Sequence, residues 1–313
     1  MHIVGVGEIL WDILDGKKLL GGAPLNFCVA CGRLGETGHL VSALGEDRLG
    51  LTARACMEKD CGLDTSFVRR VAELPTGIAK VQKDARGNGS FEISRPAAFD
   101  VLQIDSADLE RLCDLAPEWV YFGTLAQTCP QTEALLQEIL THLPKARRFY
   151  DVNLRRGHWH LPLVERLASR ATVLKLNEEE AQMISSMQND AKKFSLIEFC
   201  RRWSEQYGPE IVCVTRGEMG CSIWANGRLT SYGGYAVRVA DTVGAGDAFS
   251  AAFLHGLGQG WPMEQVAARA NAAGALVASR VGAMPLWSLD ECLELIAGHR
   301  FAENTNGNCA RSM

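Results

Sequence analysis

The chain has 313 residues, a formal net charge of −5 and a hydrophobic content of 47%, which are ordinary values for a globular protein. The acidic balance and the lack of a basic run argue against a nucleic-acid partner, and no apolar stretch is long enough to span a bilayer. The first eleven residues lack a basic start and include Glu8, so they indicate a strand and not a secretion signal. Eleven cysteines, an odd number in a long chain, favour a reduced, cytoplasmic setting over a disulfide framework.

Short apolar segments alternate with helical patterns along most of the chain. We expect strands at residues 3–6, 40–44, 119–122, 148–152, 173–176 and 211–215. We expect helices at residues 24–34, 50–61, 132–142, 163–169, 178–187, 196–207 and 271–281. This alternation predicts an α/β fold, with a Rossmann-like, mostly parallel sheet and helices on both of its faces. Ligands of such sheets bind at the carboxyl ends of the strands.

A smaller β unit interrupts the alternation. Asn88-Gly89 is a hairpin turn signal between two short strand patterns, and residues 13–20 supply a candidate third strand. We expect a β-sheet lid at residues 13–21 and 76–100, over a core of residues 1–12, 22–75 and 101–302, with Gly21-Gly22 as a hinge. An ordinary edge hairpin is the alternative. Residues 303–313 are polar and aperiodic, and we expect a disordered tail there.

Cys28 and Cys31 have the spacing of redox and zinc motifs. No second Cys or His pair follows at zinc-ligand spacing, and both residues belong to an apolar helical pattern. Because cysteine in such a pattern behaves as a small hydrophobe, we expect packing and not chemistry. His158 and His160 have no Cys or carboxylate that would complete a metal site, and we expect them in a loop.

Residues 241–249 are the most informative segment of the chain. They place Gly244, Ala245 and Gly246 before an Ala-rich helix, whose first N–H groups lack partners and carry the positive end of the helix dipole. This arrangement predicts a phosphate pocket. Asp247 stands beside it, where a carboxylate can accept a proton from an attacking hydroxyl; stabilisation of the helix dipole is the alternative. A dinucleotide site would need a third glycine and a following strand, so a nicotinamide-dependent oxidoreductase is the weaker hypothesis.

Two separated segments resemble one known family. Residues 21–35 resemble the N-terminal signature of the ribokinase-like (PfkB-type) sugar kinases, and residues 241–249 match their C-terminal signature. The resemblance covers nearly the whole chain. It implies a Rossmann-like domain with a small β lid, ATP as the phosphate donor, and Mg²⁺. It also implies that Asp247 is the general base and that the main-chain N–H groups of residues 244–246 face the transferred phosphoryl group.

Within that family the chain is most similar to the fructokinases, through residues 7–12, 21–26, 96–100 and 151–159. The resemblance implies that the sugar is bound by Asp12, Gly22, Asn26 and Arg155. From the residues alone, a turn at Asp12 and a helix cap at Asn26 explain those two positions equally well.

Two bulky residues depart from the pattern of the fructokinases. Trp11 replaces the usual aliphatic residue beside Asp12, and Phe27 follows Asn26. Both lie next to residues that the resemblance assigns to the sugar. We therefore expect them to reshape the sugar pocket.

The resemblance also implies a nucleotide site, made of Lys175, Asn177, Thr215, Gly217, Gly220, Gly246 and Asn271. Asn177 and Glu180 would organise Mg²⁺ through water, and carbonyl groups around Asp241, Val243 and Gly282 would hold K⁺ if the protein uses it. Acidic residues in a first helical turn are also expected for dipole reasons alone. We expect Glu178 and Glu179 to be solvated.

We predict an ATP-dependent kinase that phosphorylates a ketose, with fructose as the preferred acceptor. The alternatives are a kinase for another sugar or a keto-deoxy sugar acid, and a non-catalytic sugar-sensing protein of the same fold. The expected partners are ATP and a small sugar, without a nucleic acid or a membrane. The sequence leaves undecided whether the protein forms a homodimer, whose interface Ile78 and Val81 of the lid could line.

Overall fold

The computed structural model describes residues 1–14, 16–83, 89–188 and 193–309, and its centre is a nine-stranded sheet with the order β13-β12-β11-β10-β9-β8-β1-β4-β5. Its parallel part consists of β1 (His2–Val6), β4 (Thr37–Gly45), β5 (Val68–Val71), β8 (Trp119–Gly123), β9 (Arg147–Asp151), β10 (Val173–Asn177) and β11 (Ile211–Thr215). β12 (Cys221–Ala225) and β13 (Arg228–Tyr232) extend one edge in antiparallel orientation. The predicted mostly parallel α/β sheet is confirmed.

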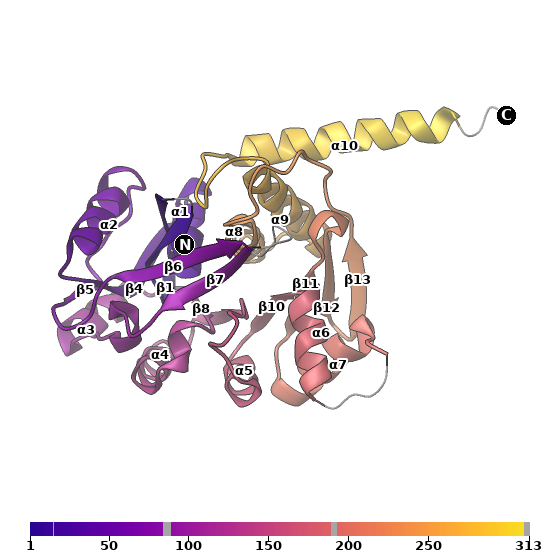
Figure 1. Ribbon diagram of the computed structural model, residues 1–313. Helices are drawn as coiled ribbons and strands as arrows, with labels where there is room; N and C mark the ends of the chain where they lie inside the picture. Colours follow the sequence, from indigo (N-terminus) through magenta and orange to yellow (C-terminus); the bar gives the residue numbers. More distant parts are fainter. Residues whose placement is uncertain (15, 84–88, 189–192, 310–313) are drawn as a thin grey trace.

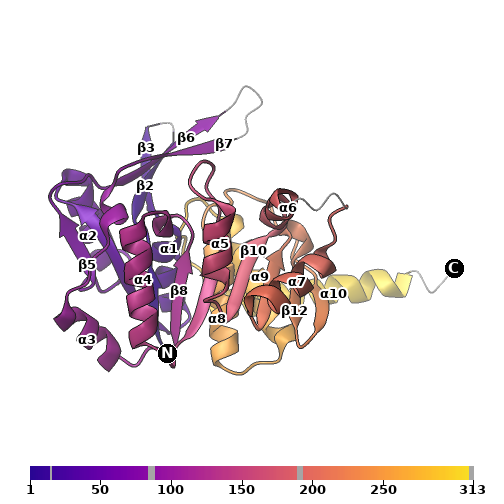
Figure 2. The ribbon, with the colours of Figure 1, turned by 90° about the horizontal axis from the view of Figure 1, so that it is seen from below.

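Helices cover both faces of this sheet (Figures 1 and 2). One core contains α1 (Ala23–Arg33), α2 (Arg48–Lys59), α8 (Ala245–Gly258) and α9 (Met263–Ala278). The other contains α3 (Ser106–Asp114), α4 (Pro130–His142), α5 (Leu161–Ala168), α6 (Glu178–Met187) and α7 (Leu196–Tyr207). Strand side chains alternate between the two cores: Tyr121 and Phe149 belong to the first, Phe122 and Tyr150 to the second. Because both faces are covered, the strands appear in the sequence as continuous apolar runs.

Short 3₁₀ turns and the last helices complete the main body. The turns are η1 (Ala98–Val101), η2 (Ala126–Thr128) and η3 (Gly217–Met219). α9 ends at Ala278, whereas the sequence predicted that this helix would end at residue 281. α10 (Leu289–Cys309) packs against α9 and then projects from the body (Figure 1). It includes residues 303–309 of the expected disordered tail, while residues 310–313 lie outside the described residues.

A second sheet has the strand order β3-β2-β6-β7 and projects from the main body (Figure 2). It consists of β2 (Leu10–Leu14), β3 (Lys17–Gly21), β6 (Gly77–Lys83) and β7 (Gly89–Ser94). β6 and β7 pair as an antiparallel hairpin, although Asn88 of the predicted turn lies outside the described residues. β2 starts at Leu10 and not at residue 13, so Asp12 is a strand residue of this sheet and not a turn residue. The roles of this sheet as a lid and as a dimer interface stay predictions; the side chain of Val81 is not described.

The cysteines and histidines of the described residues form no metal site. Ten of the eleven cysteines are free thiols, and the side chain of Cys309 is not described. Among the described residues, no cluster of three or more His, Cys, Asp or Glu side chains could hold a metal ion. Cys28 and Cys31 are fully buried in α1, and burial raises the pKa of both thiols, as expected for packing residues. His160 is the N-cap of α5, where its Nδ1 accepts from Leu163 N–H at 3.2 Å. In the same part of the chain, no helix combines the length and apolarity needed to cross a membrane.

Candidate active site

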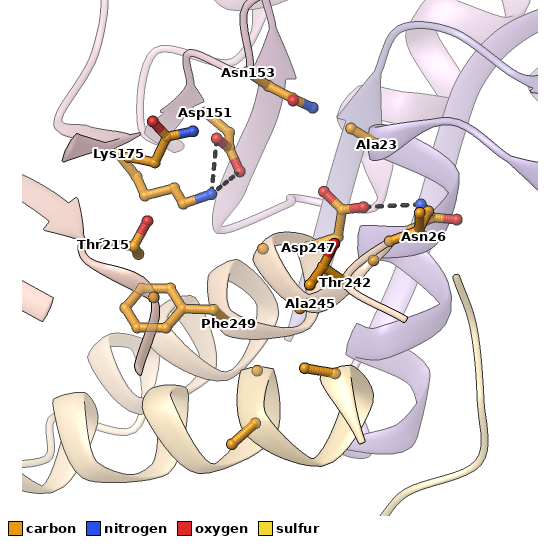
Figure 3. A pocket seen from close by; sticks show the side chains of 18 of the residues that line it. Ala23, Asn26, Asp151, Asn153, Lys175, Thr215, Thr242, Ala245, Asp247 and Phe249 are labelled. Atoms are coloured by element: carbon orange, nitrogen blue, oxygen red, sulfur yellow. Dashed lines mark hydrogen bonds and ion pairs between the residues drawn. The ribbon is translucent and has the colours of Figure 1, made fainter. Parts of the chain in front are cut away.

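A cavity of about 640 Å³ lies at the carboxyl ends of the parallel strands (Figure 3). The chain order of the strands reverses between β1 and β8, which is where α/β sheets bind their ligands. The walls come from the segments after β1, β9, β10 and β11, from α8 and α9, and from the second sheet. Its volume is in the range of pockets that hold small-molecule ligands.

The first turn of α8 presents main-chain donors to this cavity. Gly244, the N-cap residue, has a φ of 80°, and a Cβ there would lie 2.0 Å from the carbonyl oxygen of Ala283. Among the described residues, the N–H groups of Gly244, Gly246 and Asp247 donate to no other group. The N–H of Ala245, which we expected to face a phosphoryl group, instead reaches Thr242 O at 3.3 Å. Unpaired donors at the positive end of a helix form an anion pocket.

Asp247 is the third residue of α8, and its side chain is 7% exposed. Asn26 Nδ2 donates to its Oδ2 at 2.8 Å, while Oδ1 receives no hydrogen bond from any described residue (Figure 3). Burial and the nearby charge of Asp151 raise the pKa of Asp247 to about 6, although Asn26, Lys175 and Arg155 act to lower it. The carboxyl group is therefore held in place by one oxygen and able to accept a proton on the other.

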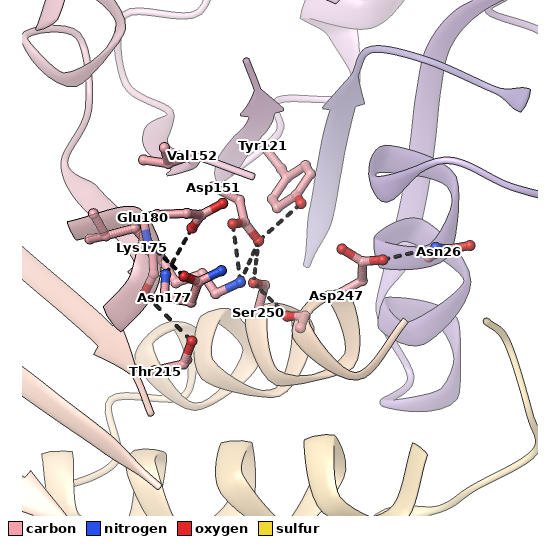
Figure 4. A network of polar contacts seen from close by, with 12 residues as sticks. Asn26, Tyr121, Asp151, Val152, Lys175, Asn177, Glu180, Thr215, Asp247 and Ser250 are labelled. Carbon is pink, nitrogen blue, oxygen red and sulfur yellow. Dashed lines mark hydrogen bonds and ion pairs between the residues drawn. The ribbon is translucent and has the colours of Figure 1, made fainter. Parts of the chain in front are cut away.

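A buried ion pair lies on the other side of the anion pocket (Figure 4). Lys175 Nζ is 3.0 Å from Asp151 Oδ1 and 2.9 Å from Oδ2. Ser250 Oγ and Tyr121 OH donate to the same Oδ2 at 2.8 Å and 3.3 Å. Burial alone would lower the pKa of Lys175, but Asp151 raises it above its usual value, so the ammonium group stays charged. A Cβ at Gly246 would lie 3.2 Å from Lys175 Nζ, which places the positive charge at the border of the anion pocket.

The residues predicted to bind sugar gather at the end of the cavity near β1 and the second sheet. Asp12, Gly22, Asn26 and Arg155 all line it. Burial raises the pKa of Asp12 to about 6. Gly22 has a φ of 117°, and a Cβ there would lie 2.4 Å from the carbonyl oxygen of Glu8. Asn26 Oδ1 is buried without a hydrogen-bond partner, so the amide has an acceptor to offer.

The prediction that Trp11 and Phe27 reshape the sugar pocket is wrong. Neither is among the described residues that line the cavity. Trp11 is buried and its Nε1 donates to Leu49 O at 3.2 Å. Phe27 is fully buried and stacks on Tyr121, with 3.8 Å between ring centroids. Both side chains belong to the core that contains α1 and α8, so their bulk fills that core and not the cavity.

Asn177 and Glu180 line the cavity and form a capping box at the start of α6. Asn177 Oδ1 accepts from Glu180 N–H at 2.8 Å, and Glu180 Oε2 accepts from Asn177 N–H at 2.8 Å. Glu180 Oε1 accepts from Leu154 N–H at 2.7 Å. Both carboxylate oxygens thus have main-chain partners, which suits an indirect role in holding an ion better than direct ligation. Glu179 is exposed as expected, but Glu178 is not simply solvated, because it pairs with Arg216 at 3.4 Å.

The predicted nucleotide loop forms the opposite end of the cavity. Thr215, Gly217, Gly220 and Asn271 all line it. Gly220 has a φ of 83°, and a Cβ there would lie 2.2 Å from the carbonyl oxygen of Tyr232. Asn271 Nδ2 donates to Gly233 O at 3.0 Å, which ties α9 to the chain after β13. In this described segment, no strand runs directly into α8, and the next element after α8 is a helix. A dinucleotide fingerprint requires a strand directly before its helix, so this segment does not provide one.

Asp241 joins the two segments that were predicted to hold a monovalent cation. Its Oδ1 accepts from Val243 N–H and its Oδ2 from Gly282 N–H, each at 3.1 Å. Val243 lines the cavity, whereas Asp241 and Gly282 are not among its described lining residues. The segments therefore meet, and the ion itself stays a prediction.

Two residues of the site have no role assigned by sequence reasoning. Asp151 lies 24 positions before its partner Lys175, on a neighbouring strand, and no spacing rule links such a pair. Glu8 is 5% exposed, lines the cavity and has no hydrogen-bond partner for Oε2. Burial raises the pKa of Glu8 to about 7. Glu8 belongs to residues 7–12, which resemble the fructokinases, but that resemblance assigned it no role of its own; its position at the end of β1 is a signal for a site.

Comparison with known proteins identifies the family. The model of the pfkB family carbohydrate kinases matches residues 10–289, and the chain belongs to this family of sugar kinases. A fructokinase from Salmonella typhimurium is 29% identical over 297 residues, which cover 89% of this chain and 94% of that protein. An aminoimidazole riboside kinase from Salmonella typhimurium strain LT2 is 28% identical over 323 residues, with 95% and 96% covered.

Solved structures share the fold. A fructokinase from Xylella fastidiosa with bound ATP has a TM-score of 0.83 and 24% identity, covering 96% of this chain and 99% of that chain. A putative ribokinase II from E. coli in complex with ATP and Mg²⁺ has a TM-score of 0.81 and 20% identity, with 95% and 99% covered. A double mutant of a fructokinase from Vibrio cholerae O395, with fructose, ADP and potassium bound, has a TM-score of 0.79 and 23% identity, with 94% and 98% covered.

The two glycines of the α8 turn should respond differently to substitution. Gly244→Ala forces a Cβ against Ala283 O at a positive φ, so we expect a loss of about 1–3 kcal/mol in the free energy of unfolding. Gly246→Ala meets only the end of the Lys175 side chain and should change stability by less than about 1 kcal/mol. Urea denaturation of both variants measures this. Equal losses would show that the backbone of this turn is not constrained as described.

Proposed function

We propose that the protein is an ATP-dependent kinase that transfers the γ-phosphate to a hydroxyl group of a ketose, with fructose as its preferred acceptor. One observation carries the proposal. The Asp247 carboxyl is held between an anion pocket, formed by unpaired N–H groups of α8, and the buried unpartnered acceptor of Asn26. A carboxylate in that position has a phosphate site on one side and a hydroxyl site on the other.

In the proposed reaction, Asp247 Oδ1 takes the proton of the acceptor hydroxyl. The hydroxyl oxygen forms a bond to the γ-phosphorus, and the bond from that phosphorus to the bridging oxygen of ADP breaks. The N–H groups of Gly244 and Gly246 donate to the phosphoryl oxygens, and Lys175 adds a fixed positive charge next to them. Catalysis of this type depends mainly on positioning and electrostatic stabilisation.

The nucleotide would lie between the Thr215–Gly220 segment and α9, with Asn271 beside it. Mg²⁺ bound with ATP would neutralise phosphate charge, and Asn177 and Glu180 would orient its waters. The capping box supports this role, since it holds Glu180 rigidly at the cavity wall. We also propose K⁺ near Asp241, Val243 and Gly282, supported by the hydrogen bonds that bring these segments together.

The acceptor can be identified by a coupled ATP-consumption screen of ketoses, aldoses, nucleosides and sugar acids. We expect the highest kcat/KM for fructose. A higher kcat/KM for another sugar, for a nucleoside or for a keto-deoxy sugar acid would show that fructose is not the preferred acceptor. The proposal that the protein is a kinase would then still stand. Binding of sugars without ATP consumption in any reaction would favour the non-catalytic sugar sensor instead.

Asp247→Asn should lower kcat by about 10²–10⁴-fold, the range expected for loss of a general base. The amide keeps the size of the side chain, so the affinities for ADP and for the sugar should change little. Steady-state kinetics and calorimetry measure the two effects separately. Asp114→Asn, at the exposed end of α3, is the matched control. Near-normal turnover by Asp247→Asn would remove this residue from the mechanism.

The pH profile should report the same carboxyl group. Because the pKa of Asp247 is raised to about 6, its proton-accepting form is lost as the pH falls through that value. We therefore expect kcat/KM to be level above about pH 7 and to fall about tenfold per unit below about pH 6. Asn26→Ala removes a hydrogen bond that lowers this pKa, so it should move the fall to higher pH. A fall that stays in place in Asn26→Ala would point to another group.

A further inference from the structure

The segment that joins α9 to α10 packs against the first turn of α8. Ala283 is buried in this segment, and its carbonyl oxygen is so close to Gly244 that a Cβ on that glycine would lie 2.0 Å away. Residues 281–287 form no helix or strand, and no main-chain hydrogen bond joins them to one another or to another described residue. Packing of Trp287 in the core and hydrogen bonds with side chains hold the segment instead. The backbone behind the anion pocket therefore depends on side chains for its position.

Arg33 supplies one of these hydrogen bonds. It is the last residue of α1, the helix that carries Asn26, and its Nη2 donates to Met284 O at 2.9 Å. Met284 directly follows Ala283, so the bond fixes the chain next to the carbonyl group that packs on α8. A cavity of only about 10 Å³, room for one water molecule, remains at this junction, and Asn26, Arg33, Gly244, Ala283 and Met284 are among its lining residues. Three elements thus meet closely behind the anion pocket.

The guanidinium group of Arg33 is not explained by an ion pair. Its side chain is partly buried, no described carboxylate pairs with it, and burial lowers its pKa. Arg280, whose charge also lowers this pKa, donates to Leu286 O and pairs with Glu291 of α10, so it holds the other end of the segment. A partly buried charge costs free energy unless hydrogen bonds compensate it. Among the described contacts, the bond to Met284 O is the one that offsets this cost for Arg33.

We propose that Arg33 is a positioning residue for the anion pocket. Through Met284 it keeps Ala283 against the N-cap of α8, which fixes the direction of the first N–H groups of that helix. The inference rests on the proposed kinase function, in which these groups stabilise the transferred phosphoryl group. Arg33 is not among the described residues that line the large cavity, so it acts through the segment and not on a ligand. A misplacement of about 1 Å at a reacting centre can cost about 10²-fold in rate, so a contact behind the pocket affects turnover.

The test compares the wild type with Arg33→Met, Arg33→Lys and the control Arg228→Met, whose arginine is exposed at the start of β13. Methionine keeps much of the apolar stem and removes the donors, whereas lysine keeps a charge and a donor without the planar fork. For each protein, kcat and KM are measured with ATP and the acceptor that the screen ranks first. Amide hydrogen exchange without ligands is followed at Ala248, whose N–H donates to Gly244 O at 2.9 Å. Thermal unfolding gives a temperature at which the proteins are folded.

We expect Arg33→Met to lower kcat at least about tenfold with little change in either KM, and to speed exchange at Ala248 at least about tenfold. Arg33→Lys should lie between Arg33→Met and the wild type, and Arg228→Met should match the wild type. A normal kcat or a normal exchange rate at Ala248 in Arg33→Met overturns the inference, as does a rise in exchange that is equal along the whole chain. If Arg33→Met does not fold, Arg33→Lys decides by the same criteria. If no acceptor is phosphorylated, the kinase proposal fails, and exchange at Ala248 still decides whether Arg33 positions this turn.

Discussion

The hydrogen bond from Asn26 to Asp247 is the contact on which the site depends. It joins residues 221 positions apart and connects α1, which follows the second sheet, to the first turn of α8. α1 and α8 also pack together in one core, so the bond is made between two rigid helices. Its geometry orients the Asp247 carboxyl and leaves Oδ1 available. Without this contact, a carboxylate next to unpaired helix donors would turn toward those donors, as acidic residues in first turns commonly do.

The two ends of the cavity offer different groups to a ligand. Main-chain donors and Lys175 supply positive potential where phosphates are proposed to lie, while Glu8, Asp12 and Asp247 face the proposed acceptor. Burying unpaired donors and charged carboxyl groups costs free energy when no ligand is bound. For the three carboxyl groups, this cost is visible in their raised pKa values. The ligands supply what is missing: hydroxyl donors for the carboxyl groups and anions for the amides. A site with unsatisfied groups of both kinds is arranged for two chemically different ligands.

The sequence was sufficient to predict the parts of this molecule that depend on local patterns. Strands buried on both faces appear as short apolar runs, and glycines before a helix indicate an anion pocket. The antiparallel edge strands β12 and β13 were not predicted, because Cys221–Ala225 follows a turn signal and its exposed neighbour lacks an apolar run. Trp11 on β2 and Phe27 on α1 were misplaced because the direction of a side chain depends on how its strand or helix packs, and both side chains belong to the same core. The Asp151–Lys175 pair could not be predicted at all, because parallel pairing of β9 and β10 creates it.

Asp12 connects the second sheet to the function proposed for the cavity. It lies on β2, in the same sheet as the hairpin β6–β7, yet it lines the cavity with Ala79 and Ile93 of that hairpin. Leu10 of β2 lines it as well, so this sheet brings apolar surface together with one carboxyl group. Apolar walls exclude water, and exclusion of water strengthens every interaction with the transferred phosphoryl group. Under the proposed function, an acceptor that hydrogen-bonds Asp12 would hold the sheet over the cavity, and recognition of the sugar would then be coupled to protection of ATP from hydrolysis.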